Sequence, residues 1–137
     1  MRRIPITLAL IAAGSLGLAR ASAAAEPMTA AEFDAFATGK TLTYALQGDV
    51  WGTEQYLSGR RVIWAFAGED CKRGTWHEEA GNICFVYEDR PEAQCWRFFR
   101  DDGSLHAQFA GDPESAPLSV VTQSSDPMPC PGPEVGV

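Results

Sequence analysis

The chain has few of the side chains that most often do chemistry in enzymes. Of its 137 residues only two are histidine, His77 and His106. A nucleophilic mechanism needs a base beside the nucleophile. However, the alternation of a strand places His77 on the face opposite to Trp76, and His106 alternates with apolar residues in the same way. Both histidines are therefore predicted on a solvent face, and we predict no catalytic residue and no enzyme activity.

The chain also lacks a Cys-x-x-Cys pair. Its four cysteines, Cys71, Cys84, Cys95 and Cys130, are 13, 11 and 35 positions apart, and neither histidine stands in ligand spacing to one of them. A zinc site is therefore a weaker interpretation than two disulfides. We predict no metal and no other cofactor.

An apolar run at the beginning of the chain, residues 4–19, follows two arginines and precedes Ala-Ser-Ala-Ala-Ala at 21–25. This order is typical of a secretory signal peptide. A transmembrane anchor is the alternative, but one proline and two glycines interrupt a run that is already short for a span of roughly 20 residues. We predict a signal peptide over residues 1–25, a periplasmic or secreted protein, and no stable membrane insertion after cleavage.

Basic residues are scarce. The chain has 11 Lys and Arg against 18 Asp and Glu, and three of the arginines lie in the predicted signal peptide. The mature chain would carry 8 basic and 18 acidic residues, a net charge of about −10. This charge argues against nucleic acid and anionic lipid as partners and permits a basic partner. A solvated acidic surface without a partner explains the same composition.

The stretch from Asn82 to Arg100 has the pattern of a β-hairpin. Two runs rich in β-branched and aromatic residues flank a polar, proline-containing connection over residues 89–93, as in two strands and their turn. A reversal around Asp89 and Arg90 places Ile83 opposite Trp96. Both side chains are therefore predicted in the core.

The same reversal decides between the three pairings that four cysteines allow. It places Cys84 opposite Cys95, and this leaves Cys71 for Cys130. Disulfides are expected because the compartment outside the inner membrane is oxidising. We predict the pairs Cys84–Cys95 and Cys71–Cys130.

The remaining sequence has the pattern of one helix followed by short strands. A capping box at residues 29–32 precedes two phenylalanines, and Gly39 follows, so a helix is predicted over residues 30–38 as a lid on one end of the β-structure. Alternating apolar segments then recur between Thr41 and Thr122 with short connections. The predicted fold is all-β, an antiparallel meander of seven or eight strands forming a small barrel or sandwich, with one short N-terminal helix.

The end of the chain changes character. Four prolines surround Cys130 in residues 124–137, and such a segment cannot join a central strand. We predict a disulfide-bonded β domain over residues 26–123 and an extended Pro-rich tail over 124–137, with Cys130 as its only anchor.

Two sets of side chains are candidates for binding. Large aromatic residues in the predicted strands favour core packing over a ligand pocket: Trp51, Tyr56, Trp64, Trp76, Tyr87 and Trp96. Acidic pairs at the predicted turns are the candidate partner-binding residues: Glu69, Asp70, Glu78, Glu79, Glu88 and Asp89.

Several short motifs resemble a group of small exported alphaproteobacterial proteins that form a domain-of-unknown-function family. They are Met28-Thr-Ala-Ala-Glu-Phe33, Gly39-Lys-Thr41, Trp51-Gly52, Tyr56-Leu57, Gly74-Thr-Trp76, Ile83-Cys-Phe85 and Cys95-Trp96. The resemblance implies export and a β-meander with a Cys84–Cys95 bridge, and it brings no established activity. The plan is also similar to that of periplasmic lysozyme inhibitors, although their inhibitory loop is not found in this chain.

Three hypotheses about function follow from these patterns. The first is a non-catalytic periplasmic protein that captures or inhibits a basic envelope protein such as a lysozyme-like enzyme. The alternatives are a lipocalin-like carrier of a small apolar ligand and a structural envelope protein. Inward tryptophans around a void would favour the carrier, whereas a filled interior with acidic loops would favour the protein binder.

Overall fold

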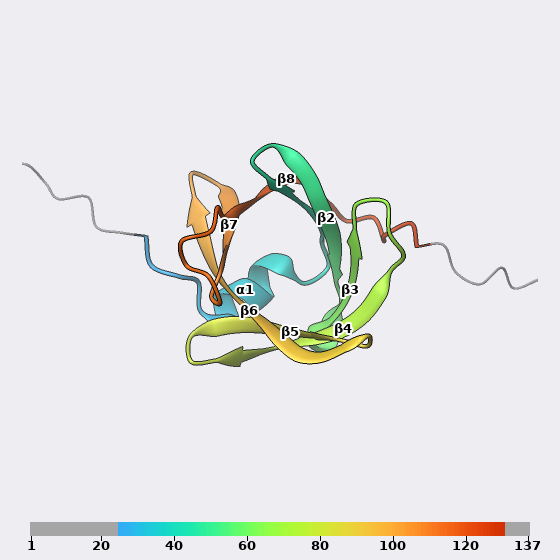
Figure 1. Ribbon diagram of the computed structural model, residues 1–137, viewed down its shortest axis with the longest axis horizontal. Helices are drawn as coiled ribbons and strands as arrows, with labels where there is room; N and C mark the ends of the chain where they lie inside the picture. Colours follow the sequence, from blue (N-terminus) through green and yellow to red (C-terminus); the bar gives the residue numbers. More distant parts are fainter. Residues whose placement is uncertain (1–24, 131–137) are drawn as a thin grey trace, which may run out of the picture.

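The computed structural model describes residues 25–130. Residues 1–24 of the predicted signal peptide and residues 131–137 of the predicted tail lie outside this range. Eight antiparallel strands, each paired with its neighbours in the sequence, close into a barrel that Figure 1 views along its axis. They are β1 (Thr41–Leu46), β2 (Asp49–Tyr56), β3 (Arg61–Phe66), β4 (Lys72–Glu79), β5 (Asn82–Tyr87), β6 (Arg90–Asp101), β7 (Ser104–Phe109) and β8 (Leu118–Ser124). The predicted all-β fold is confirmed, and the architecture is a barrel of eight strands.

Helix α1 (Ala30–Ala37) lies across one end of the barrel (Figure 1). The predicted capping box is present, because the Glu32 N–H donates to Thr29 Oγ1 at 3.2 Å and the Thr29 N–H donates to Glu32 Oε2 at 2.8 Å. Phe33 is completely buried. Its ring centroid lies 4.3–5.5 Å from those of Phe98, Trp76 and Tyr56. So short a helix is not stable alone, and this aromatic contact holds it on the barrel as the predicted lid.

The central hairpin has the predicted register. Ile83 pairs with Trp96 and Cys84 pairs with Cys95 in strands β5 and β6. The disulfide Cys84–Cys95 joins the second pair. The other predicted disulfide, Cys71–Cys130, is present as well.

The connection inside this hairpin is shorter than predicted. Residues 90–93, expected in the turn, belong to β6, and only Glu88 and Asp89 make the reversal. Tyr87 pairs with Arg90 and Phe85 with Gln94, so three residues of β6 stand opposite one residue of β5. Such a bulge accommodates a proline, which has no N–H for the ladder. The predicted turn residues are therefore an irregular start of a long strand.

The two ends of the barrel differ because consecutive connections alternate between them. The connections over residues 57–60, 80–81 and 102–103 lie at the end that α1 covers. The connections over residues 47–48, 67–71, 88–89 and 110–117 lie at the other end. We call this second end the mouth.

The Pro-rich tail has more anchors than the one predicted. The Thr41 hydroxyl donates to the Asp126 carbonyl at 2.6 Å, and the Met128 N–H donates to Gln55 Oε1 at 3.0 Å. These contacts and the disulfide Cys71–Cys130 hold residues 126–130 against the outside of the barrel. The expectation that Cys130 is the only anchor was wrong, because polar side chains facing outward from β1 and β2 bind backbone groups that prolines leave without strand partners.

Removal of each disulfide tests how the fold is stabilised. Replacing Cys71 and Cys130 by alanine should lower the free energy of unfolding by about 4 kcal/mol, and replacing Cys84 and Cys95 by about 3 kcal/mol. The order follows from the sequence separations of 59 and 11 residues, since closing a longer loop restricts the unfolded chain more. Urea unfolding of the two double variants measures both values. A clearly larger loss from the shorter loop would contradict this account.

Candidate functional site

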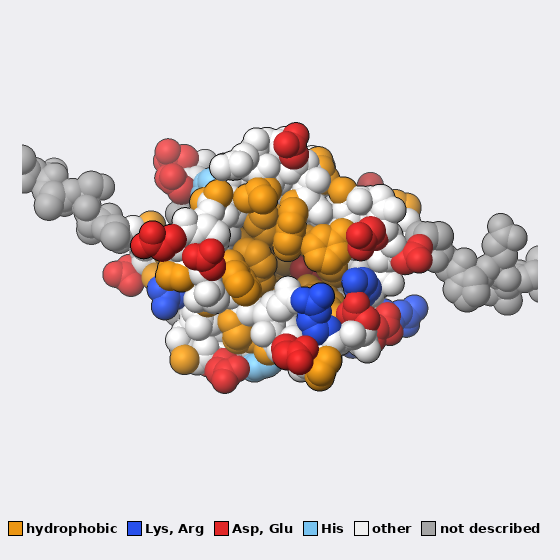
Figure 2. Space-filling view, in the orientation of Figure 1, with side chains coloured by type: hydrophobic (Ala, Val, Ile, Leu, Met, Phe, Trp, Pro, Cys, Tyr) orange, Lys and Arg blue, Asp and Glu red, His pale blue; other side chains and the backbone are white. Residues whose placement is uncertain are grey.

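The mouth of the barrel is lined by aromatic side chains that are only half-buried. Figure 2 looks into this end and shows hydrophobic side chains gathered around a hollow at its centre. The Trp51 ring lies 5.1 Å from the Phe66 ring and 5.9 Å from the Trp96 ring, and Trp96 lies 5.0 Å from Phe109. These rings are half-buried, and no helix within residues 25–130 covers this end. The mouth is the candidate site.

Two spaces open from the mouth. The outer one is a groove of about 320 Å³. Its walls come from the end of β1 and the β1–β2 turn, from β2, β6 and β7, and from the β7–β8 connection and the start of β8: Leu46, Gln47, Trp51, Gln94, Trp96, Phe109, Ser115, Ala116 and Leu118. A volume of this size is at the lower end of the range for small-ligand sites, roughly 300–1,000 Å³. We call it the mouth groove.

The inner space is much smaller. Below the groove, side chains fill the barrel and leave a cavity of about 30 Å³ for the centres of water molecules, roughly room for two waters. Trp51, Gln94, Trp96 and Leu118 line both the groove and this inner cavity, so the two spaces are adjacent. The interior cannot hold a fatty acid or a molecule of similar size.

The floor of the inner cavity is polar. Glu54 is 4% exposed, and the Tyr87 hydroxyl donates to its Oε1 at 2.8 Å. The hydroxyls of Tyr44 and Tyr56 share a hydrogen bond of 2.7 Å beside it. One carboxyl and three phenols therefore meet inside an otherwise aromatic barrel.

Burial determines the charge of these groups. It raises the pKa of the Glu54 carboxyl to about 8, and the hydrogen bond from Tyr87 opposes this only in part. Burial also raises the pKa of the Tyr44, Tyr56 and Tyr87 hydroxyls, so all three stay neutral. At pH 7 the carboxyl of Glu54 is mostly protonated, because burial in a medium of low polarity disfavours its charged form.

Two glycines make room for the inward rings. A Cβ at Gly52 would lie 2.3 Å from the Trp64 ring, and one at Gly74 would lie 2.8 Å from the Tyr87 ring. The absence of a side chain at these two strand positions lets an aromatic ring lie against the backbone. Gly74 thereby positions Tyr87, the hydrogen-bond donor to Glu54.

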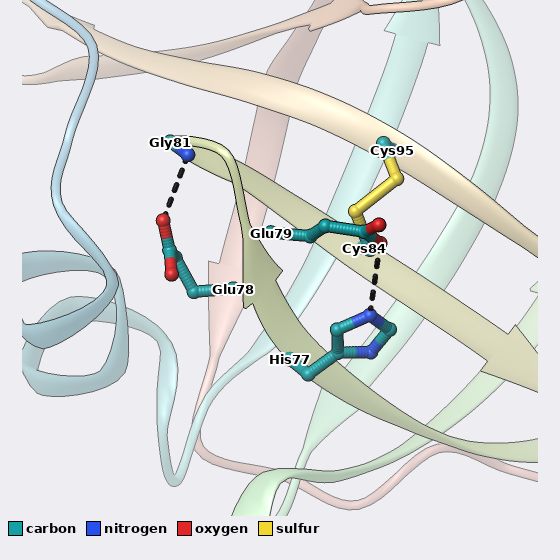
Figure 3. A network of polar contacts seen from close by, with 6 residues as sticks. All are labelled: His77, Glu78, Glu79, Gly81, Cys84 and Cys95. Atoms are coloured by element: carbon teal, nitrogen blue, oxygen red, sulfur yellow. Dashed lines mark hydrogen bonds and ion pairs between the residues drawn. A yellow bond between two sulfur atoms is a disulfide. The ribbon is translucent and has the colours of Figure 1, made fainter.

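The predicted acidic residues do not form one surface. Glu69, Asp70, Glu88 and Asp89 lie in connections at the mouth, but Glu78 and Glu79 lie at the end of β4, near the covered end of the barrel. Figure 3 shows this second location, where Glu78 Oε1 accepts from the Gly81 N–H at 2.7 Å and Glu79 Oε2 lies 3.4 Å from His77 Nε2. Glu78 therefore stabilises its own turn.

The mouth pairs also differ from each other. Glu88 Oε1 accepts from the Arg73 N–H at 3.0 Å, and Asp89 Oδ2 lies 2.8 Å from Lys72 Nζ. The hydrogen bond from Lys72 holds the pKa of Asp89 below its usual range. Glu69 and Asp70 are exposed in the connection before Cys71.

A possible metal cluster lies outside the mouth. His77, Glu79 and Cys84 bring one potential ligand atom each within 4.8 Å of one another. However, the Cys84 sulfur is bonded to Cys95 (Figure 3), and a disulfide sulfur is not a thiolate ligand. The cluster therefore supports no metal site.

Sequence reasoning missed Glu54 and misplaced Trp96. Ile83 is buried as predicted, but Trp96 is half-buried at the mouth, because its position in β6 lies beyond the part of the barrel that the lid fills. The sequence does contain a signal for Glu54. Residues two apart on a strand share a face, so Glu54 lies on the same face of β2 as Gly52 and the inward-facing Tyr56. A carboxyl on the aromatic face of a predicted strand is the pattern that could have found it.

The chain matches no family model, no curated protein and no solved structure. The resemblance to exported alphaproteobacterial proteins and to periplasmic lysozyme inhibitors stays a prediction. Within residues 25–130, no helix is long and apolar enough to span a bilayer.

The substitution Glu54→Gln tests the buried carboxyl. Between the ordinary pKa of 4.5 and the raised value of about 8, the folded protein binds a proton that the unfolded chain has lost. The stability that this proton contributes is complete below about pH 4.5 and is lost as the pH rises toward 8. Glutamine has a similar volume and does not titrate. The free energy of unfolding of the variant, measured relative to that of the unmodified protein by urea unfolding, should therefore rise by on the order of 4 kcal/mol from pH 5 to pH 9.

The matched control is Glu92→Gln, which removes an exposed carboxyl. Its stability should follow that of the unmodified protein across the same pH range. A constant stability difference between the Glu54→Gln variant and the unmodified protein would contradict a raised pKa at Glu54.

Proposed function

We propose that the protein is a non-catalytic binding domain of the envelope that captures a basic protein through its mouth. The observation that carries the proposal is the combination of an aromatic groove of about 320 Å³ with an acidic rim. Aromatic rings in a concave site accept an apolar or cationic side chain of a partner. Acidic residues around them favour a partner of opposite charge.

The charge of the rim is strongly one-sided. The connections at the mouth and the strand ends beside them carry eight exposed acidic residues: Asp49, Glu69, Asp70, Glu88, Asp89, Glu92, Asp112 and Glu114. The same segments carry three basic residues, Lys72, Arg73 and Arg90, and Lys72 is already paired with Asp89. Figure 2 shows acidic side chains around the hollow, and most of the basic ones lie to its lower right. Such a field raises the association rate of a basic partner.

The interior volume favours this proposal over the carrier hypothesis. A lipocalin-like carrier holds its ligand inside the barrel, but the cavity here is about 30 Å³. The mouth groove alone is large enough for a small apolar ligand, and that ligand would remain partly in water. The filled interior and the acidic connections are the combination expected of a protein binder. The two disulfides are compatible with a location outside the cytoplasm.

Charge reversal at the two ends of the barrel tests the proposal. The variant Glu69→Lys/Asp70→Lys changes the mouth, and Glu79→Lys/Asp101→Lys changes the net charge equally at the covered end. With a lysozyme as the basic probe, the mouth variant should lower the association rate constant by roughly tenfold at low salt, and the control should have a much smaller effect. Surface plasmon resonance at low and high salt measures both.

Melting temperatures identify variants that are merely unfolded. The four exposed side chains have no buried contacts, so both variants should melt within a few degrees of the unmodified protein. Absence of lysozyme binding to the unmodified protein at low salt would overturn the proposal. Equal effects of the two variants would show that overall charge, and not the mouth, attracts the partner.

A further inference from the structure

Glu54 is an acid without a basic counterpart in its surroundings. The residues that line the inner cavity include no lysine, arginine or histidine. The titratable groups that face Glu54 are the phenols of Tyr44 on β1, Tyr56 on β2 and Tyr87 on β5. A buried carboxyl is costly unless it is neutral or paired.

The position of Glu54 fits a guest that enters from the mouth. Trp51 and Trp96 line both the groove and the inner cavity, so the inner cavity with Glu54 lies directly behind the groove. Ring faces along this path attract a cation. The acidic rim at the mouth and the carboxyl of Glu54 at the floor therefore both favour a cationic group.

The size of the cavity selects the cation. Room for about two waters, within about 30 Å³, accepts an ammonium group, which is compact, but not the wider planar guanidinium of arginine. A lysine side chain carries its ammonium on a flexible four-carbon stem and has three donors. The carboxylate of Glu54 and the hydroxyl oxygens of Tyr44 and Tyr56 offer acceptors for these donors.

We propose that the mouth groove and Glu54 form a site for a primary alkylammonium group, supplied by a lysine side chain of the basic partner. This inference rests on the proposed function and names the group that the mouth recognises. The stem lies among Trp51, Trp96 and Leu118, and the ammonium forms an ion pair with Glu54.

Binding moves a proton in this scheme. Glu54 holds its proton at pH 7, because its pKa is raised to about 8. An incoming ammonium stabilises the carboxylate and lowers that pKa. The carboxyl proton therefore leaves to solvent as the ion pair forms, and the amine keeps its own three protons. The affinity for the ammonium group should rise with pH between 7 and 9, because a smaller fraction of Glu54 then carries the proton that has to dissociate.

The direct test uses n-butylammonium as the probe and 1-butanol as its neutral counterpart. Tryptophan fluorescence of the full domain should report binding of n-butylammonium at least about tenfold tighter than that of 1-butanol. Glu54→Gln should abolish this preference, and the control Glu79→Gln, at an exposed position near the covered end of the barrel, should retain it. n-Butylguanidinium should bind about tenfold more weakly than n-butylammonium because it does not fit the inner cavity.

A second measurement needs no variant. Calorimetry of n-butylammonium binding at pH 7, in two buffers with different ionisation enthalpies, should detect release of close to one proton. At pH 9.5, where Glu54 is already ionised and the amine is still charged, the release should largely disappear. Absence of proton release at pH 7, or equal binding of n-butylammonium and 1-butanol, would overturn the ammonium site.

Lysozyme then separates this inference from the proposed function. Acetylation of its lysines and the Glu54→Gln substitution should each weaken capture at least about tenfold at high salt, where steering by the rim is screened. Capture that is sensitive to rim charge but insensitive to both changes would overturn the ammonium site and leave the proposed function standing. Binding of n-butylammonium without capture of lysozyme would overturn the proposed function and the lysine as the source of the ammonium.

Discussion

Closure of the barrel is the constraint on which the rest of the structure depends. Eight strands paired in sequence leave no free sheet edge, and they enclose an interior that only side chains can fill. Aromatic rings fill most of it, and Phe33 enters from the covering helix to complete the packing at one end. Among residues 25–130, no helix covers the other end. The mouth is thus the part of the core that the described residues leave partly exposed.

The polar floor of the barrel follows from the same constraint. A carboxyl that faces inward in a closed barrel cannot reach bulk water, so Glu54 must be neutral, hydrogen-bonded or paired with a cation. The hydrogen bond from Tyr87 and the raised pKa of about 8 satisfy this requirement without a partner. A cationic guest would satisfy it by pairing instead. In the scheme that we propose, these two states differ by one proton, so occupancy of the site would be coupled to pH near neutrality.

Local patterns in the sequence were sufficient for the elements and for the central hairpin. The capping box at Thr29 located the helix, and the register around Asp89 located both disulfides, because such signals involve residues that are close along the chain. The choice of a barrel over a sandwich depends on the pairing of β1 with β8, which joins distant segments. No short-range pattern reports that pairing.

The site was harder to predict because its members come from separate strands. Alternation indicated which residues face inward, but depth along the barrel axis decides whether a ring is core or mouth, and depth depends on the stagger of all strands. Trp96 was therefore predicted as core and lies at the mouth. The acidic pairs were predicted together as partner-binding residues, although alternate connections lie at opposite ends of a meander barrel. Glu78 and Glu79 are consequently far from Glu69 along the barrel.

The most direct measurement of the central claim is an NMR titration of the Glu54 side-chain carboxyl carbon, with and without n-butylammonium. We expect a midpoint near 8 for the free protein and a midpoint at least about two units lower when the amine saturates the site, as release of close to one proton at pH 7 requires. A midpoint near the ordinary value of 4.5 in the free protein, or one that the amine leaves unchanged, would contradict that claim.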